Sequence, residues 1–424
     1  MIRLLYSLLL YFAVPFILMR LYLRGMRSSG YRQRITERFG YFYPAQDFDN
    51  SQTIIWIHAV SVGETVAAEP LVKAIKKLLP EVQILITSMT PTGAERVESL
   101  FGNSVFHSYL PYDLPTAVNR FLNSVNPDLL IIMETELWPN LIHQCKQRGV
   151  KTLLANARLS AKSAAGYWRF SGITRSMLQS LSAIAAQSNE DANRLEKLGA
   201  YSDSITVTGN LKFNVEHPTV SKDTYLSAIK KSGRTVIIAA STREGEELKV
   251  LSAFQRILKN IPEVLFILVP RHPERFNEIA DLALQKGFSS VLRSEQTVPT
   301  ADIQLIIGDS MGEMGAYYAV SDIAFVGGSL VDTGCQNVLE PAALSIPVIV
   351  GPSQFNFAQI CKQLENAGGL RTVANESELA SVLTELVKNG RLRKEMGQLA
   401  RGVIDSNQKA LPNLMKVING LIGN

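Results

Sequence analysis

The chain has 424 residues, a length that favours two domains of about 200 residues over a single hydrophobic core. Charged residues make up 19% and apolar residues 46%, which excludes a disordered chain and a multi-pass membrane protein. The net charge of +5 is modest, and no basic stripe interleaved with aromatic residues occurs, so no nucleic-acid partner is expected. Cys145, Cys335 and Cys361 are widely separated, which argues against a disulfide framework or a zinc site.

An apolar, charge-free run, Leu4–Met19, opens the chain. It falls a little short of the about 20 residues that a membrane-spanning helix needs, and no small-residue cleavage site follows it. The arginines that come next are Arg20, Arg24, Arg27, Arg32, Arg34 and Arg38. Arginines beside an apolar segment stay on the cytoplasmic side and attract anionic lipid. We therefore predict a membrane anchor over residues 1–24, spanning or embedded, with the body of the protein in the cytoplasm. A helix buried under the first domain is the alternative.

Beyond this segment, short apolar runs alternate with helical patterns, as expected for parallel sheets with crossover helices. Predicted strands of the first half are Ile54–Val60, Gln83–Ser88, Asp128–Met133 and Ile205–Asn210, and Thr65–Leu79 is a predicted helix. The polar segment 213–234 is expected to be a linker, and Thr235–Ser241 opens a second series of strands. We expect an α/β fold with two Rossmann-like domains, residues 25–215 and 216–424, that face each other across a cleft.

Three acidic residues follow predicted strands of the first half, where an open parallel sheet places its chemistry. Glu64 lies at the turn after the first strand, beside Gly63, and could take a proton from an attacking hydroxyl. A first-turn glutamate that only favours the helix dipole is the alternative. Glu134 and Glu136 follow an apolar strand, and their charges should interact. One of this pair capping a helix is the competing interpretation.

Basic residues also follow predicted strands. Lys212 comes after the last strand of the first half and could neutralise a phosphate or a carboxylate. Pro270 and Arg271 follow a strand of the second half, and arginine has the planar donors that suit a phosphate. A solvated lysine and a surface ion pair between Arg271 and Glu274 are the respective alternatives.

Two glycine-containing loops of the second half end at predicted helix starts, where free backbone N–H groups bind anions. The first contains Met311, Gly312 and Glu313; the second contains Asn337, Val338, Leu339 and Glu340. Glu340 is placed to accept hydrogen bonds from a ribose diol. Helix capping is the alternative for each loop, but two loops at neighbouring strand ends favour a nucleotide phosphate.

No GxGxxG, GxxxxGK[ST] or HExxH motif occurs, and neither a metal site nor a cofactor is expected. The Asp-x-Asp formed by Asp47 and Asp49 precedes the first predicted strand and is interpreted as a polar loop.

The motifs HAVSVGET, TSMTPTGAERV, METELWPNL, TGNLKF, LVPRHPERF, GDSMGEM and NVLEPAA, with others over nearly the whole chain, resemble the 3-deoxy-D-manno-octulosonate (Kdo) transferase family of lipopolysaccharide assembly. The resemblance implies a metal-independent glycosyltransferase with two Rossmann domains (GT-B type). It implies CMP-Kdo as donor and, as acceptor, the lipid A precursor lipid IVA, a phosphorylated tetraacyldisaccharide that is met at the inner membrane.

Carried over by position, the resemblance makes Glu64 the proton acceptor, and Glu134 and Lys212 stabilisers of the transition state. It assigns contacts with CMP to Pro270–Arg271, Met311–Glu313 and Asn337–Glu340. One departure occurs in GCQNVLEP, where some members have histidine and proline at the positions of Gln336 and Val338. Two other functions stay open: a nucleotide-sugar 2-epimerase of similar fold, and a membrane-bound lipid-binding scaffold without turnover.

Overall fold

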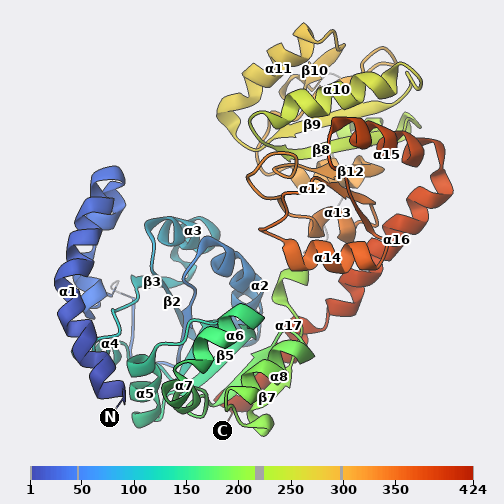
Figure 1. Ribbon diagram of the computed structural model, residues 1–424. Helices are drawn as coiled ribbons and strands as arrows, with labels where there is room; N and C mark the ends of the chain where they lie inside the picture. The colour runs from blue at the N-terminus through green and yellow to red at the C-terminus, as the bar shows by residue number, and fades with distance from the viewer. Residues whose placement is uncertain (1, 45–46, 215–223, 297–298, 424) are drawn as a thin grey trace. The chain divides into compact units, whose positions relative to one another are not determined.

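The computed structural model describes residues 2–44, 47–214, 224–296 and 299–423 and divides into two compact units (Figure 1). Unit 1 comprises Met1–Asn214 and Gln408–Asn424, and unit 2 comprises Val215–Asn407. The chain passes from unit 1 to unit 2 between residues 214 and 215. Residues 215–223 of the predicted linker, which include Pro218, lie outside the described residues.

Unit 1 is built on a parallel sheet with the strand order β3-β2-β1-β4-β5-β6-β7. Its strands are β1 (Ile54–His58), β2 (Gln83–Ser88), β3 (Phe106–Tyr109), β4 (Leu129–Met133), β5 (Lys151–Ala157), β6 (Ala183–Ala186) and β7 (Ile205–Val207). The central strands β1 and β4 are buried at every position and, apart from His58 at the end of β1, apolar, because helices cover both faces of the sheet. β1 begins at the predicted residue, and β2 has the predicted bounds.

The helices of unit 1 are α1 (Ile2–Arg27), α2 (Val62–Leu78), α3 (Pro91–Phe101), α4 (Pro115–Val125), α5 (Pro139–Gln147), α6 (Ala161–Trp168), α7 (Ser171–Leu178), α8 (Asn189–Lys197) and α17 (Ala410–Ile422). Successive residues of a strand face opposite sides of the sheet. Ile55 and Ile57 of β1 accordingly pack with α2, α3 and α17. Ile54 and Trp56 pack with α4, α5, α7 and α8 on the other face.

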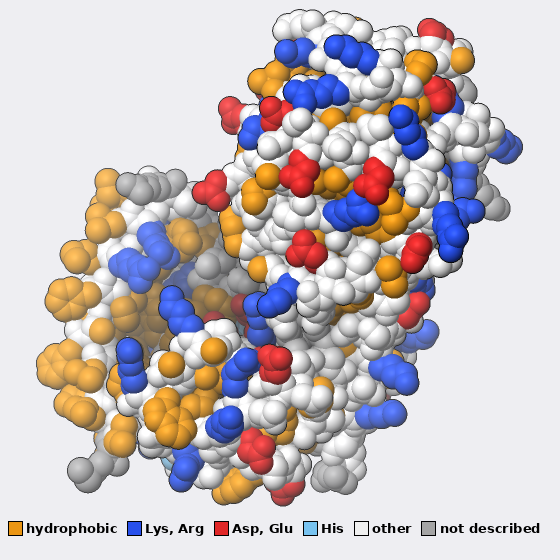
Figure 2. Space-filling view, turned by 45° about the vertical axis from the view of Figure 1, so that its right-hand side comes forward, with side chains coloured by type: hydrophobic (Ala, Val, Ile, Leu, Met, Phe, Trp, Pro, Cys, Tyr) orange, Lys and Arg blue, Asp and Glu red, His pale blue; other side chains and the backbone are white. Residues whose placement is uncertain are grey.

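Helix α1 is held against unit 1 by polar contacts near its beginning. Arg3 Nη1 and Ser7 Oγ donate to Asn140 Oδ1 at 3.0 and 3.1 Å, and the Tyr11 and Thr116 hydroxyls are 2.9 Å apart. Its large apolar side chains, including Leu4, Phe12 and Phe16, are mostly exposed (Figure 2). This exposure contradicts the alternative of a buried helix. Among the described residues, α1 is the one helix long and apolar enough to cross a membrane.

Unit 2 contains a second parallel sheet, of order β10-β11-β9-β8-β12-β13-β14. Its strands are β8 (Val236–Thr242), β9 (Leu265–Pro270), β10 (Ser290–Leu292), β11 (Leu305–Ile307), β12 (Ile323–Val326), β13 (Val348–Val350) and β14 (Leu370–Thr372). Its helices are α9 (Thr224–Lys231), α10 (Glu246–Leu258), α11 (Phe276–Gln285), α12 (Met314–Val320), α13 (Leu339–Ala343), α14 (Ala358–Asn366), α15 (Glu376–Lys388) and α16 (Gly390–Asn407). Helix α9 lies inside the segment 213–234 that was predicted to be a linker, so that prediction is wrong for these residues. A helix forms here because Tyr225, Leu226 and Ile229 give it an apolar face that is buried in unit 2.

The last helix corrects the expected second domain at its C-terminal end. Residues 408–424 belong to unit 1 and not to a domain that runs from 216 to 424. Ala410, Leu414 and Ile418 recur at helical spacing, and all three are buried against α2 and the first sheet. Apolar residues at helical spacing indicate a helix, but the spacing cannot say which of two apolar cores receives it.

The packing of α17 predicts a stability effect in unit 1. Leu414→Ala should lower the free energy of unfolding by about 2–5 kcal/mol, because a fully buried leucine is replaced by a cavity. Lys416→Ala, at an exposed position of the same helix, should change it by less than about 0.5 kcal/mol. Denaturant unfolding of the two variants measures both values. Equal effects would contradict this packing.

Candidate active site

The loops that carry the predicted acids of unit 1 leave adjacent strands at the centre of its sheet. From β1 the order runs outward through β2 and β3, whereas from β4 it runs the other way through β5 to β7. Ligands of open α/β sheets bind outside the carboxyl ends of the strands at such a reversal. Glu64 follows β1 and Glu134 follows β4, so both lie at the reversal point.

Glu64 occupies the first turn of α2 and is held by its own local structure. Its Oε2 accepts from the Val60 N–H at 2.7 Å, and its Oε1 accepts from Ser61 Oγ at 3.0 Å. Ser61 in turn caps α2 by accepting from the Glu64 N–H. Glu64 therefore lies in the first turn of a helix, as the helix-start interpretation requires. These bonds fix the orientation of the carboxylate and leave further lone pairs of both oxygens for another donor.

The surroundings of Glu64 favour its protonated form. The residue is 9% exposed, and burial is the main reason why its pKa rises to about 7. The hydrogen bonds from Val60 and Ser61 oppose this rise, whereas the negative charges of Glu134 and Glu136 add to it. A carboxyl group that titrates near neutral pH can exchange a proton with a substrate hydroxyl.

The turn at Gly63 is exposed and uncrowded. A Cβ atom at Gly63 would meet only Ser61 Oγ, at an ordinary contact distance of 3.8 Å. No positive φ angle requires this glycine, and its missing side chain leaves the surface of the helix start open. The predicted use of Gly63, close approach of a ligand to the backbone, is consistent with this space.

Glu134 and Lys212 meet, although the sequence separates them widely. Lys212 Nζ lies 3.1 Å from Glu134 Oε1, an ion pair without hydrogen-bond geometry. Glu134 has a φ angle of 56°, a left-handed conformation that non-glycine residues seldom adopt. Such strain often occurs at functional sites. Glu136 is half-buried, and this burial, followed by the charge of Glu134, raises its pKa.

Asn156 connects the end of β5 with the loop of Lys212, and sequence reasoning missed it. Its Oδ1 accepts from the Leu211 N–H at 3.0 Å, which holds the short 3₁₀ turn Leu211–Phe213. Its own φ angle is 52°. A polar residue inside the apolar strand TLLANA was the available signal.

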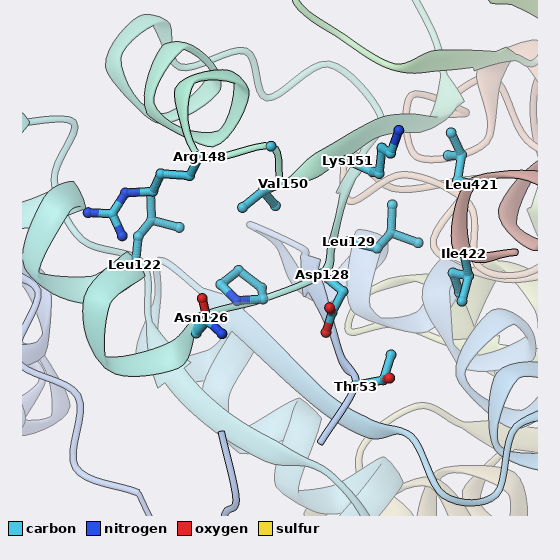
Figure 3. Close-up of a pocket in the computed structure, with 12 residues that line it drawn as sticks. Thr53, Leu122, Asn126, Asp128, Leu129, Arg148, Val150, Lys151, Leu421 and Ile422 are labelled. Carbon is cyan, nitrogen blue, oxygen red and sulfur yellow. The ribbon is translucent and has the colours of Figure 1, made fainter. Parts of the chain in front are cut away.

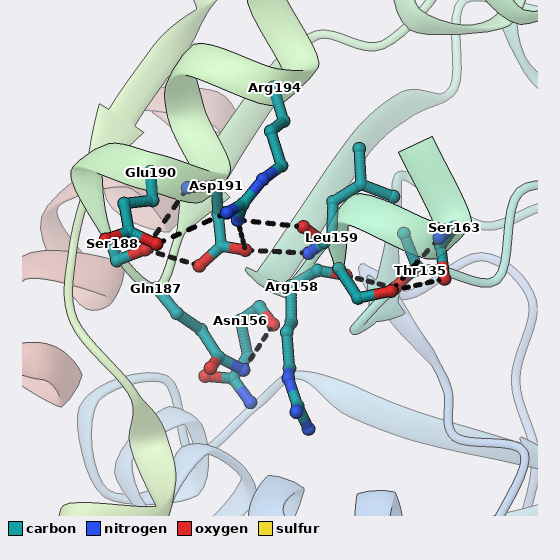
Figure 4. A network of polar contacts seen from close by, with 11 residues as sticks. Thr135, Asn156, Arg158, Leu159, Ser163, Gln187, Ser188, Glu190, Asp191 and Arg194 are labelled. Carbon is teal, nitrogen blue, oxygen red and sulfur yellow. Dashed lines mark hydrogen bonds and ion pairs between the residues drawn. The ribbon is translucent and has the colours of Figure 1, made fainter. Parts of the chain in front are cut away.

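A polar network joins the loops after β4, β5 and β6 (Figure 4). Thr135 Oγ1 donates to the Arg158 carbonyl at 2.5 Å, and Asp191 Oδ1 accepts from the Leu159 N–H at 2.8 Å. Asp191 also accepts from Ser188 Oγ, which caps α8. These bonds keep the three loops in fixed positions beside Glu134.

A separate cavity of about 350 Å³ opens at the amino ends of β1, β4 and β5 (Figure 3). It is lined by Thr53, Asp128 and Lys151, with Leu421 and Ile422 from α17. Asp128 uses its Oδ2 to accept from the Ile54 N–H at 2.8 Å, which is a structural role. The cavity is at the opposite edge of the sheet from Glu64, so it is not part of the candidate site.

In unit 2 the strand order reverses between β8 and β12, and Glu246 joins the loops after these two strands. The fully buried Glu246 carboxylate accepts backbone N–H groups from Gly328, Ser329 and Leu330 at 2.6, 3.0 and 2.8 Å. Gly327 must be glycine here, since a Cβ would lie 2.8 Å from Glu246 Oε2. Sequence reasoning missed Glu246, although acids directly after a strand in STREGEE were a signal.

Two arginines gather at the ends of β8 and β9. The exposed Arg271 follows Pro270, and its N–H donates to the Thr242 carbonyl at 3.0 Å. Arg243, missed from the sequence, contacts His272 Nε2 through Nη1 at 2.5 Å. Burial, followed by the charge of Arg271, lowers the pKa of Arg243. Two nearby positive charges favour an anion at this edge of the sheet.

The loop before α12 presents backbone to the solvent. Met311 is exposed, and Gly312 has a φ angle of 82° with open space around it. Glu313 forms an ion pair with Arg293 Nη2 at 2.9 Å and accepts from Ser310 Oγ. Direct contact of Glu313 with a ligand would therefore compete with Arg293.

The second loop is ordered by Asn337, whose Nδ2 donates to Glu340 Oε1 at 2.8 Å while its Oδ1 accepts from the Leu339 N–H at 3.0 Å. Burial raises the pKa of Glu340. Val338 and Leu339 are 0% and 2% exposed as whole residues, so their side chains belong to the core and their backbone is covered as well. Within the described residues, no group of three or more His, Cys, Asp or Glu residues could hold a metal ion.

Comparison of the fold with solved structures finds enzymes of nucleotide-sugar chemistry. The UDP-GlcNAc 2-epimerase from Neisseria meningitidis, bound to UDP-GlcNAc, is similar at 15% identity and a TM-score of 0.57, covering 87% of this chain and 99% of that one. A glycosyltransferase from Rickettsia africae matches at 16% identity and a TM-score of 0.54, covering 88% and 99%. The two Rossmann-like sheets are thus those of a GT-B-type α/β protein, as expected.

Sequence comparison defines the family. Residues 33–215 match the profile described as 3-deoxy-D-manno-octulosonic-acid transferase (kdotransferase). The 3-deoxy-D-manno-octulosonic acid transferase of Haemophilus influenzae is 42% identical over 98% of both chains, and that of Bordetella pertussis is 36% identical over 87% of both. The chain belongs to the 3-deoxy-D-manno-octulosonic acid (Kdo) transferase family and is a glycosyltransferase.

The carboxylate cluster predicts a coupled titration. Glu134→Gln removes one negative charge near Glu64, so the pKa of Glu64 should fall from about 7 toward its usual value without reaching it, because burial remains. Carbon-13 NMR of labelled glutamate carboxyl groups measures this pKa. Glu98→Gln, at an exposed position on α3, should leave it unchanged. An unaltered pKa in Glu134→Gln would contradict the proximity of the two carboxylates.

Proposed function

We propose that the protein transfers Kdo from CMP-Kdo to lipid IVA, with inversion at the anomeric carbon and without a metal ion. The observation that carries this proposal is the position of Glu64. In a chain of the Kdo transferase family, a nearly buried carboxylate with a pKa of about 7 lies at the reversal point of the first sheet. Glu134 and Lys212 lie at the same edge, in contact with each other.

In the proposed mechanism, Glu64 acts as the general base. The acceptor hydroxyl attacks the anomeric carbon of Kdo from the face opposite to CMP. The ionised Glu64 takes the hydroxyl proton as the new C–O bond forms, and the bond to the CMP phosphate breaks with its electron pair on the phosphate oxygen. The N–H of Val60 and the hydroxyl of Ser61 hold the carboxylate in place during this step.

Positive charge develops on the sugar in such a reaction, since its transition state resembles an oxocarbenium ion. The carboxylate of Glu134 is suited to stabilise that charge. Lys212, paired with Glu134 at 3.1 Å, orients this carboxylate and is itself suited to an anionic group of the donor. The left-handed backbone of Glu134 gives its side chain this direction.

Negative charge develops on departing CMP, and unit 2 has the groups to stabilise it. Arg271 and Arg243 lie at the ends of β9 and β8. The backbone of Met311–Glu313 is open to a nucleotide. In the second loop, Asn337 orients Glu340, whose carboxylate is suited to the ribose. Because CMP has one phosphate, fixed arginines and peptide N–H groups suffice in place of a divalent ion.

The exposed apolar side of α1 supports the proposed location. Leu4, Phe12 and Phe16 would enter the lipid, and the arginines after residue 19 would stay with headgroups at the cytoplasmic face of the inner membrane. The anchored enzyme then meets a lipid acceptor at the membrane surface.

The two alternative functions, a nucleotide-sugar 2-epimerase and a membrane-bound lipid-binding scaffold, differ from a transferase in their products. An epimerase converts a nucleotide sugar without an acceptor, and its support here is likeness of fold alone. A scaffold would release no CMP. Relatives of 42% and 36% identity that are transferases favour transfer over both.

The test is mass spectrometry of lipid IVA incubated with CMP-Kdo and the purified protein. We expect product masses increased by whole Kdo units, together with released CMP. Glu64→Gln should keep donor affinity within a few-fold and lower the transfer rate by about 10²–10⁴-fold, the usual contribution of a general base. Glu98→Gln should transfer at the normal rate. An unmodified lipid with the wild-type protein would refute the proposed function, and normal turnover by Glu64→Gln would refute its role as the base.

A further inference from the structure

A cavity of about 260 Å³ lies between α1 and the carboxyl edge of the first sheet. Its charged wall contains Arg20 and Arg24 from α1, and Arg38 from the 3₁₀ turn Ile35–Phe39. Its apolar wall contains Leu10, Ile17, Leu21, Met89 and Trp138. The cavity, here called the arginine pocket, thus combines cationic and apolar surfaces.

Arg38 is the unusual member of this pocket. The residue is 2% exposed, and its guanidinium lies over the Tyr109 ring at 4.1 Å. Nη1 donates to the Met89 carbonyl at 3.0 Å. Nε and Nη2 are buried and make no hydrogen bond of normal geometry with the residues that the structure describes. Leaving the donors of a buried cation without acceptors is unfavourable unless a ligand supplies them.

The nearby acids do not neutralise Arg38. Glu37 pairs with Arg34 at 2.6 Å and accepts from the Tyr109 N–H and from Ser108 Oγ. Asp113 lines the pocket, but it accepts the Asn140 and Leu141 N–H groups at the start of α5.

Tyr112 reports on the charge in the pocket. Burial raises the pKa of its hydroxyl. The positive charge of Arg38, a side-chain hydrogen bond with Arg38 and the charge of Arg20 oppose the rise. Both arginines therefore act on one hydroxyl in the pocket wall. Planar guanidinium groups are suited to phosphate oxygens, which accept two donors from each arginine.

We propose that the arginine pocket binds a phosphate group of the lipid acceptor, with Arg38, Arg20 and Arg24 as donors and the apolar wall against the adjoining lipid. This inference rests on the proposed function for the identity of the lipid. Met89 and Tyr112 follow β2 and β3, so the pocket is at the same edge of the sheet as Glu64. A phosphate held there fixes the sugar headgroup beside the base. The pocket thereby selects phosphorylated disaccharides over neutral glycolipids of the same acyl composition.

The experiment measures binding, so that it does not depend on transfer. The detergent-solubilised full chain is titrated with lipid IVA and with analogues that lack one or the other phosphate. For wild type we expect removal of one of the phosphates to weaken binding by about 10- to 100-fold, the range for a charge-assisted hydrogen bond. The double variant Arg20→Gln/Arg24→Gln and the variant Arg38→Lys should bind the phosphorylated and dephosphorylated lipids within about threefold of each other.

Two controls make the result decisive. Arg32→Gln removes a charge from the same arginine-rich segment but outside the pocket, and it should keep the wild-type preference. Arg20 and Arg24 are exposed, so the double variant should fold even if a change at buried Arg38 destabilises the protein.

Two results would overturn the proposal. One is a wild-type protein that binds the lipid equally well with and without either phosphate, and the other is a double variant that keeps the full preference for phosphorylated lipid. Inorganic phosphate alone binding equally tightly would overturn the lipid as its source. Failure of Kdo transfer with intact phosphate preference would instead refute the proposed function.

Discussion

The proposed chemistry depends on a carboxylate that is nearly buried at the carboxyl edge of a parallel sheet. Burial would force Glu64 to stay protonated at neutral pH if nothing else acted on it. The N–H of Val60 and the hydroxyl of Ser61 favour the ionised form, and the charges of Glu134 and Glu136 oppose it. The balance leaves the pKa at about 7, where the group changes its charge with little energy. The pKa of Glu64 therefore depends on the positions of Ser61 and Glu134, which are set by the ends of β1 and β4.

The candidate ligand-binding groups of unit 2 are backbone N–H groups and arginines, whereas those of unit 1 are mainly carboxylates. Glu246 is buried like Glu64, but its oxygens accept three N–H groups of one loop and keep that loop fixed. The neighbouring loops present exposed backbone at Met311–Glu313, and arginines lie at the adjoining strand ends. A site made of fixed N–H groups and guanidinium groups suits a leaving phosphate, because its dipoles need no rearrangement when charge appears.

The sequence predicted much of this fold for a simple physical reason. Strands covered by helices on both faces are apolar throughout, and the turns between them contain glycine, proline and polar residues. This gave β1, β2 and β4 within about two residues, the usual error at element ends. The same patterns could not assign α17 to a domain, since its apolar face fits either core. Helix α9 was predicted as part of the linker because it is short and flanked by polar residues.

The candidate site was predictable where a residue directly follows a strand, as Glu64, Glu134 and Arg271 do. It was not predictable where three-dimensional contacts decide the role. The contact of Lys212 with Glu134, the support from Asn156 and the buried arginine in the wall beside α1 all join segments far apart in the chain. The burial of Val338 and Leu339 was equally hidden, because a loop motif does not say which side chains turn into the core.

The proposed role of Glu64 as a base with a pKa near neutral pH is measured through the pH dependence of transfer at saturating substrates, from about pH 5 to about pH 9. A carboxyl group with a raised pKa gains its basic form as the pH rises. The rate should therefore increase about tenfold per pH unit below pH 7 and level off above it, with a midpoint near the pKa of about 7. A rate already constant from pH 5 upward, as an ordinary exposed glutamate would give, would contradict the account.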